Sequence, residues 1–175
     1  PLTNTRVMSL GSVACRSVKA TVIGRNVHPV VIDPVSTTAP LLESVDLTLD
    51  FSGENGDGVQ VKNYANIGTL TLRVLSFTPS GLGPVIRTNG SSIHLQHLIL
   101  DTPKITVGKD TTMGIVRLSS GTIDRVTVID PDIVWPSITN GNNCVLIEGA
   151  NVGDVLFRGG LVTSGDTLVR INSGV

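Results

Sequence analysis

The sequence predicts an all-β solenoid, and three observations support this fold class. The composition favours strands, since 24 Val, 14 Ile and 19 Thr make up 57 of the 175 residues and β-branched side chains pack well on pleated sheets. An apolar pattern also recurs along the chain at a nearly constant spacing. Finally, no segment shows the apolar stripe of an amphipathic helix. The length allows one domain with its own hydrophobic core.

The repeat begins with an apolar residue that is followed by apolar residues three and five positions later. Successive copies start 25, 28, 28 and 29 residues apart, and a fixed period in this range is typical of stacked coils. The five copies are Leu42/Val45/Leu47, Ile67/Leu70/Leu72, Leu95/Leu98/Leu100, Ile123/Val126/Val128 and Val152/Val155/Phe157.

Two further apolar points complete each repeat. Nine or ten positions after each start comes a second strand position, occupied by Phe51, Phe77, Ile105, Ile133 and Leu161. A third, alternating stretch follows, and its five copies are Val59-Gln60-Val61, Ile86-Arg87-Thr88, Val116-Arg117-Leu118, Val145-Leu146-Ile147 and Val169-Arg170-Ile171. Turn-forming groups such as Thr88-Asn89-Gly90 separate the strands. Each coil is therefore expected to contain three short strands.

Two related repeat architectures do not fit. Leucine-rich repeats share the opening pattern, but they need Asn or Cys eight positions after the first apolar residue. That place holds Asp50, Leu75, Pro103, Pro131 and Gly160. The hexapeptide period of a left-handed β-helix is also missing from the sequence.

Over residues 42–175 this coil pattern resembles the right-handed parallel β-helix of pectate lyases, polygalacturonases and bacteriophage tailspikes. The resemblance implies an all-β, right-handed parallel β-helix with three parallel sheets, three strands per coil and five to six coils. Coils would rise by about 4.8 Å each, so that equivalent residues stack in ladders. Because the shared motif is a coil pattern, it indicates the fold more strongly than the function.

The domain organisation follows from the part of the chain in which the repeat occurs. Residues 1–40 fit the period poorly and are expected to form an N-terminal cap or a degenerate first coil, with Val18/Thr21/Ile23 as its copy and Val30-Val31-Ile32 as its later strand. Residues 41–175 form the β-helix. The last residues, Asn172 to Val175, stand where a turn should begin another coil. We therefore expect the solenoid to continue beyond residue 175 or to pack on a partner there.

The net charge of the chain and the motifs that it lacks make several classes of ligand unexpected. Thirteen Lys and Arg against fourteen Asp and Glu give a net charge of -1, which lacks the basic footprint of nucleic-acid binding. No apolar run reaches the roughly 18 residues of a membrane span. Metal-ligand spacing, nucleotide-binding loops and esterase motifs are not found, so no cofactor and no metal are expected. His94 and His97 lack acidic partners at ligand spacing.

Stacking directs the search for functional residues across coils. The middle position of the third strand places Arg87 and Arg117 about one coil apart, roughly 5 Å. They form a repulsive pair unless an acid or anion lies near. The two residues are therefore either an anion-binding or subunit-facing stripe, or a solvated face. Trp135 is the candidate aromatic platform for a sugar, or else packs in a turn. On the first strand, Arg125 is expected to pair with Asp154 of the next coil.

The weak catalytic candidates are carboxylates in the turn after the first strand. Asp130 and Asp132 are two residues apart, and Asp101 belongs to the preceding coil. Two of them could approach the separation of about 5–9.5 Å that glycosidases use. Asp in a turn often simply bonds the backbone. The clustered Asp, His and Arg-x-Lys pattern of polygalacturonases and the calcium-binding Asp set of pectate lyases are not recognisable.

The resemblance therefore supports a structural role more strongly than a catalytic one. The leading hypothesis is a host-recognition domain of a virion tailspike or appendage that binds a surface polysaccharide. Such a domain would be virion-borne or extracellular, and homo-oligomeric, with a trimer favoured, or bound to other virion proteins. One alternative is a polysaccharide lyase or glycoside hydrolase, that is, a depolymerase of the same fold. A second alternative is a virion decoration or structural protein without a ligand.

The two cysteines provide a test of the coil order. Cys15 precedes the first full repeat and Cys144 precedes the third strand of the fourth coil. About four coils at ~4.8 Å each put them too far apart for a disulfide. Because alternation points Val145 and Ile147 inward, Cys144 is expected to be the more accessible thiol.

Overall fold

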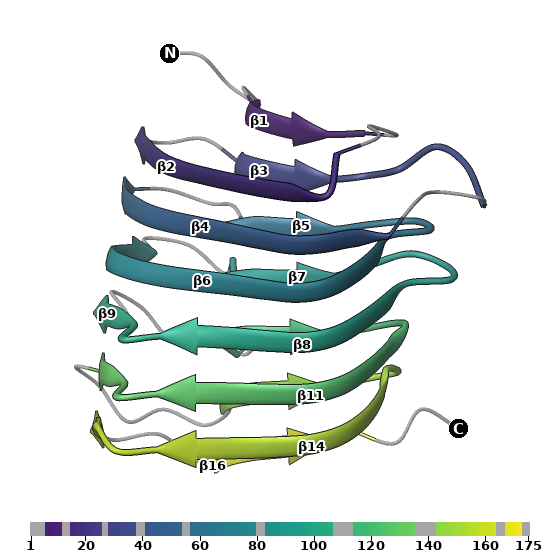
Figure 1. The fold of residues 1–175 in the computed structure, drawn as a ribbon. Coiled ribbons are helices and arrows are strands. Elements are labelled where there is room, and N and C mark those ends of the chain that lie inside the picture. The colour runs from purple at the N-terminus through teal and green to yellow at the C-terminus, as the bar shows by residue number, and fades with distance from the viewer. Residues whose placement is uncertain are drawn as a thin grey trace.

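The structure is a computed structural model that describes residues 6–11, 15–25, 28–37, 41–53, 57–79, 83–106, 114–135, 143–163 and 167–172. Every element in these ranges is a β-strand, so the predicted all-β class is confirmed (Figure 1). The strands are β1 (Arg6–Leu10), β2 (Ser17–Arg25), β3 (His28–Ile32), β4 (Leu42–Gly53), β5 (Val59–Val61), β6 (Asn66–Pro79), β7 (Ile86–Thr88), β8 (His94–Asp101), β9 (Lys104–Thr106), β10 (Val116–Leu118), β11 (Thr122–Ile129), β12 (Asp132–Val134), β13 (Asn143–Ile147), β14 (Asn151–Arg158), β15 (Leu161–Thr163) and β16 (Thr167–Ile171).

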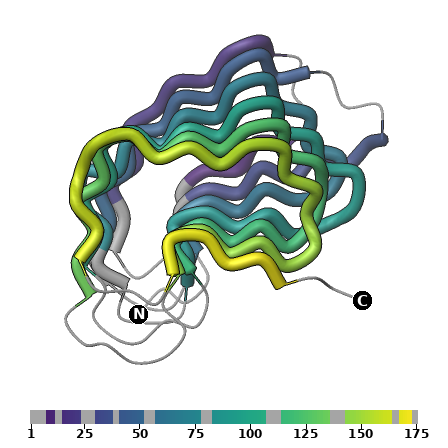
Figure 2. Tube along the Cα trace, turned by 90° about the horizontal axis from the view of Figure 1, so that it is seen from below, coloured from purple at the N-terminus to yellow at the C-terminus, as the bar shows by residue number. Residues whose placement is uncertain are grey.

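The strands stack in parallel ladders to form a β-solenoid. One sheet follows the order β1-β3-β5-β7-β10-β13-β16, and the other contains the long strands and the short strands β9, β12 and β15. Figure 2 looks along the solenoid and shows successive coils superimposed around a common interior. The described termini lie at opposite ends of the stack (Figure 1).

The solenoid has about four turns, slightly fewer than the expected five to six coils. Four long strands, β4, β6, β8 and β11, bury all of their inward apolar side chains. The strands beyond them, β2 and β14, leave most of theirs half-buried. The inward side chains of the outermost described copies are therefore less buried than those of the central ones.

The strand register confirms the five copies of the repeat. Ile123, Val126 and Val128 of β11 pair with Leu95, Leu98 and Leu100 of β8 on one side. The same three residues pair with Val152, Val155 and Phe157 of β14 on the other side. The copies in β4, β6 and β8 align in the same way. All five third-strand copies also stack in register, and Val30-Val31-Ile32 joins them as expected.

The predicted register is wrong at Leu161 and in the N-terminal copy Val18/Thr21/Ile23. Val162, and not Leu161, pairs with Ile133 in the second-strand ladder, and Leu161 is exposed. In the N-terminal copy, Val18 pairs with Val45 and Ala20 pairs with Leu47. Thr21 therefore lies on the exposed side of β2, because the true copy is offset by three residues from the predicted one.

The described strands form two hydrogen-bonded sheets, whereas the resemblance implied three. In the coils that begin with β4 and β6, the first and second strands are one continuous strand, which carries Phe51 or Phe77 near its end. In later coils the chain breaks at Thr102 and Asp130, whose φ angles are 47° and 44°. Each is followed by a proline, which has no N–H to donate to a ladder. Separate second strands therefore begin only with β9.

Inward-facing aliphatic side chains fill the solenoid from Val22 to Ile147. Thr88 is a polar residue at an inward position of its third strand, Ile86-Arg87-Thr88, and it is fully buried. Its hydroxyl donates to the Ser120 carbonyl at 2.8 Å and accepts from the Ser120 N–H at 3.3 Å. Burial of this hydroxyl is tolerated because both of its hydrogen-bonding roles are satisfied.

Candidate functional site

Arg87 and Arg117 lie side by side on the outer face of the third-strand sheet. They are register partners in β7 and β10, as predicted. A carboxylate accompanies each of them, since Arg117 Nε donates to Glu148 Oε2 at 2.6 Å and Arg87 Nη1 lies 3.9 Å from Asp57 Oδ2. The repulsion expected between two stacked cations is thus offset by acids on the coils either side.

Sequence reasoning missed Asp57 and Glu148, although the signal was present. Asp57 stands two residues before one third strand, and Glu148 follows directly after another. Asp57 is buried and accepts a hydrogen bond from Gln60 Nε2 at 2.6 Å. Ser119 Oγ donates to Glu148 Oε2 at 3.1 Å. Two cations and two anions therefore lie together in this partly buried group.

The same outer face is more covered than strand alternation suggests. Leu146 holds the middle position of its third strand, yet it is only 3% exposed. Gly114, with φ of 72°, runs so close that an added Cβ would lie 2.9 Å from Leu146 Cβ. The glycine is required there both for its left-handed backbone and for this close approach. Backbone therefore covers part of the face that was expected to be open.

Trp135 lies in the hydrophobic core and is 4% exposed. It follows β12, directly after Val134. A sugar platform needs an exposed ring face, so this residue fits the packing alternative considered for it.

The three candidate carboxylates lie in different surroundings. Asp101, at the end of β8, accepts hydrogen bonds from Arg73 of the preceding coil at 2.6 and 2.9 Å. Asp130 occupies the left-handed turn after β11, and its side chain fills the space above Gly159. Asp132 begins β12 and has an exposed side chain. Asp132 lines a pocket.

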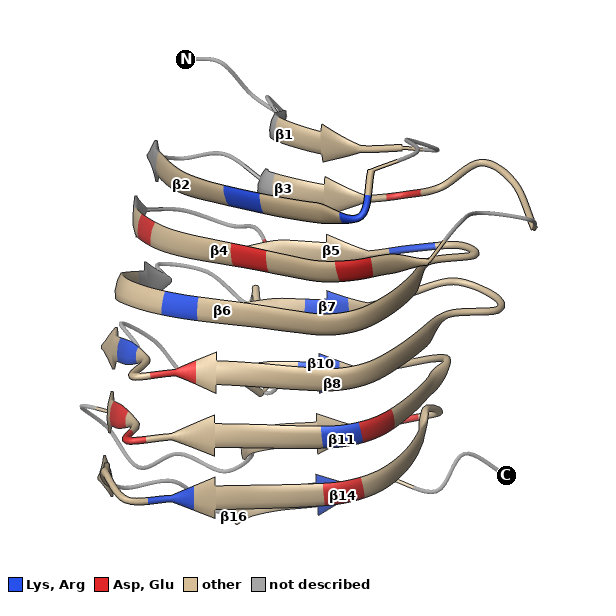
Figure 3. Ribbon diagram, viewed as in Figure 1, with Lys and Arg blue, Asp and Glu red and all other residues tan. Residues whose placement is uncertain are grey.

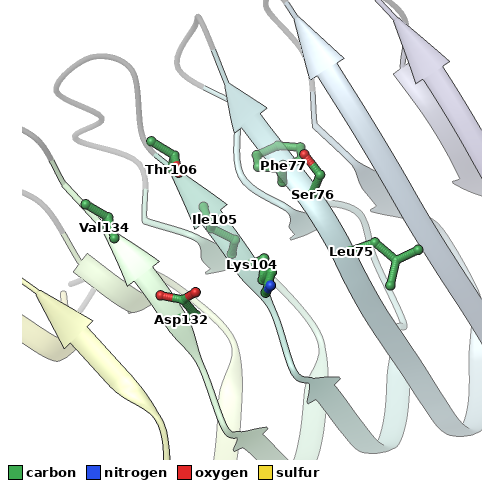
Figure 4. A pocket seen from close by; sticks show the side chains of 8 residues that line it. All are labelled: Leu75, Ser76, Phe77, Lys104, Ile105, Thr106, Asp132 and Val134. Atoms are coloured by element: carbon green, nitrogen blue, oxygen red, sulfur yellow. The ribbon is translucent and has the colours of Figure 1, made fainter.

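That pocket is an open hollow of about 230 Å³ on the lateral face, where β6, β9 and β12 lie next to one another (Figure 4). Lys104 and Asp132 face each other across two neighbouring strands, as register partners in β9 and β12. Ser76 and Thr106 add hydroxyl groups, and Leu75 and Val134 add apolar surface to the lining.

A bulge in β6 creates the apolar part of the pocket. Leu49 of β4 pairs with Val74, but the next residue, Asp50, pairs with Ser76, so Leu75 is an extra residue in β6. Bulges of this kind redirect a side chain and bend the strand. Leu75 is consequently 50% exposed. The apolar repeat does not reveal the pocket. Although Leu75 is inserted into β6, the apolar residues on either side of it still point inward, so the inward pattern looks undisturbed.

The outer face of the long strands carries a series of cross-coil polar pairs. Arg125 lies 3.4 Å from Asp154 of the next coil, which confirms the predicted pair. His94 Nε2 lies 3.3 Å from Asp124, and His97 Nε2 lies 2.9 Å from the Thr127 hydroxyl. Burial lowers the pKa of His97, and the nearby charges of Arg125 and Arg158 lower it further. These contacts join neighbouring coils along this face, where Figure 3 shows the basic position of β11 above the acidic position of β14.

Comparison with known proteins found no matching family model, no matching curated protein and no matching solved structure. Among the described residues, no group of three or more His, Cys, Asp or Glu side chains is arranged to hold a metal ion. The part of the chain that the structure describes contains no long apolar helix of the kind that crosses a bilayer. The lateral pocket is therefore the candidate site on which a function can be argued.

Proposed function

We propose that this chain is a structural recognition domain that binds a surface glycan on its lateral face, as part of a virion tailspike or appendage. The observation that carries glycan binding is the lateral pocket, in which an ammonium group, a carboxylate, two hydroxyl groups and two exposed aliphatic side chains meet. The assignment to a virion rests on the resemblance to tailspike β-helices and on the β-solenoid fold.

The pocket lining matches the chemistry of a sugar. Sugar hydroxyl groups both donate and accept hydrogen bonds, and Lys104, Asp132, Ser76 and Thr106 together supply both roles. Sugar C–H faces are apolar and suit the exposed methyl groups of Leu75. Since the hollow is open, a chain of sugars could enter it and continue along the ladder beyond it.

The positions and contacts of the three carboxylates favour binding of a glycan over its cleavage. Hydrolysis of a glycosidic bond needs two carboxyl groups that face the scissile bond. Among the described residues of the lining, Asp132 is the single carboxylate. Asp101 is held by Arg73, and Asp130 is packed over Gly159. This distribution supports a binding role for Asp132.

The binding test uses the purified 1–175 chain and a panel of bacterial surface polysaccharides on an array, followed by titration calorimetry on any that bind. Asp132→Asn and Lys104→Met should each weaken binding by about tenfold, because a hydrogen bond to a charged group contributes about 1.5–3 kcal/mol. The matched control is Lys19→Met, which removes an exposed lysine from β2, away from the pocket. Equal affinity in all three variants would overturn the assignment to this pocket.

A second assay separates binding from catalysis. The same polysaccharides, and pectin, are incubated with the chain and the reducing ends are counted. We expect no new ends. If cleavage occurs and Asp132→Asn abolishes it, the depolymerase alternative replaces our proposal. If nothing binds and nothing is cleaved, the domain is a decoration or structural protein without a glycan ligand.

A further inference from the structure

The turn after β7 carries the dipeptide Asn89-Gly90, which lies outside the lateral pocket. The side chain of Asn89 is exposed, and its backbone N–H donates to the Val61 carbonyl at 2.9 Å. Asparagine is a thermally labile residue, because the backbone nitrogen of the next residue can attack its side-chain amide. The attack is easiest when the next residue is glycine, since no side chain then shields that nitrogen.

Packing against the preceding coil requires a glycine at position 90. A Cβ added there would lie 2.8 Å from the backbone nitrogen of Asn63 and closer still to the Asn63 side-chain oxygen. Any other residue would have to displace the turn, because the contact is with backbone, and glycine is the residue that permits such a close approach. The stacking of the coils therefore places, directly after Asn89, the residue that least hinders attack on it.

A serine on the next coil holds the nitrogen that would attack. The Gly90 N–H donates to Ser120 Oγ at 2.9 Å. This nitrogen must lose its proton to become a nucleophile, and the hydrogen bond opposes that loss and fixes the orientation of the peptide plane. The backbone of Ser120 is held independently, since its N–H and its carbonyl both bond the Thr88 hydroxyl. The stack therefore positions the Ser120 hydroxyl to restrain the reactive nitrogen.

We propose that Asn89 is a site of spontaneous deamidation and that the Ser120 hydroxyl limits its rate. In the first step the Gly90 nitrogen bonds to Asn89 Cγ, and the bond from Cγ to the side-chain nitrogen breaks. The proton lost by Gly90 N–H leaves with that nitrogen as ammonia, and a succinimide ring remains. Water then adds to either carbonyl of the ring and opens it, which gives aspartate or isoaspartate in place of Asn89.

The isoaspartate product changes the geometry of the turn. It adds one carbon atom to the main chain between the two residues of the dipeptide. The turn then cannot keep both the bond from Asn89 N–H to Val61 and the bond from Gly90 N–H to Ser120 at their present lengths. The reaction should therefore loosen the corner between β7 and β8.

The test compares serine variants of the purified 1–175 chain in mildly alkaline buffer. After timed incubation, mass spectrometry measures the deamidated fraction of the peptide that contains Asn89. Ser120→Ala should react about fivefold faster than the native chain, the factor expected from the loss of one ordinary hydrogen bond. Ser119→Ala is the matched control, because the hydroxyl of this neighbouring serine donates to Glu148. It should react at the native rate, and Ser120→Thr, which keeps a hydroxyl group, should remain slow.

Two further measurements do not depend on the rates of the variants. Amide exchange followed by NMR should show that Ser120→Ala exposes the Gly90 N–H, while the Asn89 N–H keeps its bond to Val61 and its protection. The native chain unfolded in urea should deamidate at Asn89 faster than the folded native chain does.

The outcomes separate the site from its control. If Asn89 stays intact in both the native chain and Ser120→Ala, it is not a deamidation site. If Ser120→Ala and Ser119→Ala react at equal rates, or the folded native chain reacts as fast as the unfolded one, the role of Ser120 is overturned.

Discussion

Cys144 shows how strongly the surroundings of a single residue can differ from what strand alternation predicts. It was expected to be the more accessible thiol, but every residue of β13 from Asn143 to Ile147 is buried. Cys144 is fully buried, whereas Cys15 is half-buried and only packs against the core. Both thiols are free, in agreement with the predicted coil order.

The order of thiol labelling should therefore be the reverse of the one expected from sequence. Burial raises the pKa of the Cys144 thiol to about 12, so almost none of it is thiolate at pH 8. With iodoacetamide in native buffer, Cys15 should be alkylated first and Cys144 only after unfolding. Timed mass spectrometry of the peptides measures both rates. Faster labelling of Cys144 would contradict the buried position of β13.

His97 links the polar face of the long strands to pH. Its lowered pKa means that the folded state favours the neutral ring, while the unfolded chain has a histidine with an ordinary pKa near 6.5. As pH falls below about 6.5, the unfolded state takes up a proton more readily, and the free energy of unfolding decreases until the pH passes the folded-state pKa.

The His97→Gln variant should lose less stability than the native chain between pH 7.5 and pH 5. Glutamine can still bond the Thr127 hydroxyl but does not titrate. Urea unfolding at the two pH values gives the four free energies needed for the comparison. If both proteins lose the same amount of stability, His97 does not contribute to the acid sensitivity.

At the scale of the element, each strand is stabilised by the strands on both sides of it. Val126 of β11 and Val155 of β14 are register partners of the same residue type. Val126 is fully buried because β8 and β14 flank its strand, while Val155 lies in the last described coil and is half-buried. Comparing substitutions at these two residues therefore measures how much a covering coil contributes to the free energy of unfolding.

Val126→Ala should lower the free energy of unfolding by about 2 kcal/mol or more, since it removes two buried methylene equivalents and leaves a cavity. Val155→Ala should cost about half as much or less, because its side chain already contacts water. Urea unfolding of the purified 1–175 chain and its two variants measures both losses. Equal losses would show that the last coil is covered in solution.

At the scale of the whole molecule, stability should be graded along the solenoid axis. Each coil contacts only its neighbours, so the total is close to a sum of nearest-neighbour terms. The central strands β6 and β8 lie between coils with fully buried inward side chains, and the strands of the last coil do not.

Amide hydrogen exchange should show this gradient. In the purified 1–175 chain, β6 and β8 are expected to exchange more slowly than β14, β15 and β16, because the last coil can open without disrupting the central ones. Mass spectrometry of the labelled peptides resolves the strands. Uniform protection from β6 to β16 would indicate a single cooperative unit.

The sequence by itself determined the coil. Its apolar positions recur with a period that only stacked strands can satisfy, so the inward ladders of β4, β6, β8, β11 and β14, and the third-strand ladder, could be predicted residue by residue. The pairing of Arg125 with Asp154 followed from the same register. Local chemistry is sufficient for this part, because side-chain alternation along a strand needs no knowledge of distant segments.

The tertiary structure alone decided most of the contacts on the outside. The partners of Arg87 and Arg117 come from residues outside the strand motif, and the cover over Leu146 comes from the backbone at Gly114. The pocket at Asp132 and Lys104 depends on the bulge at Leu75. Outward positions carry no periodic constraint, since water accepts almost any side chain there. Their contacts are set by how turns and bulges direct the chain across neighbouring coils, which the apolar repeat does not encode.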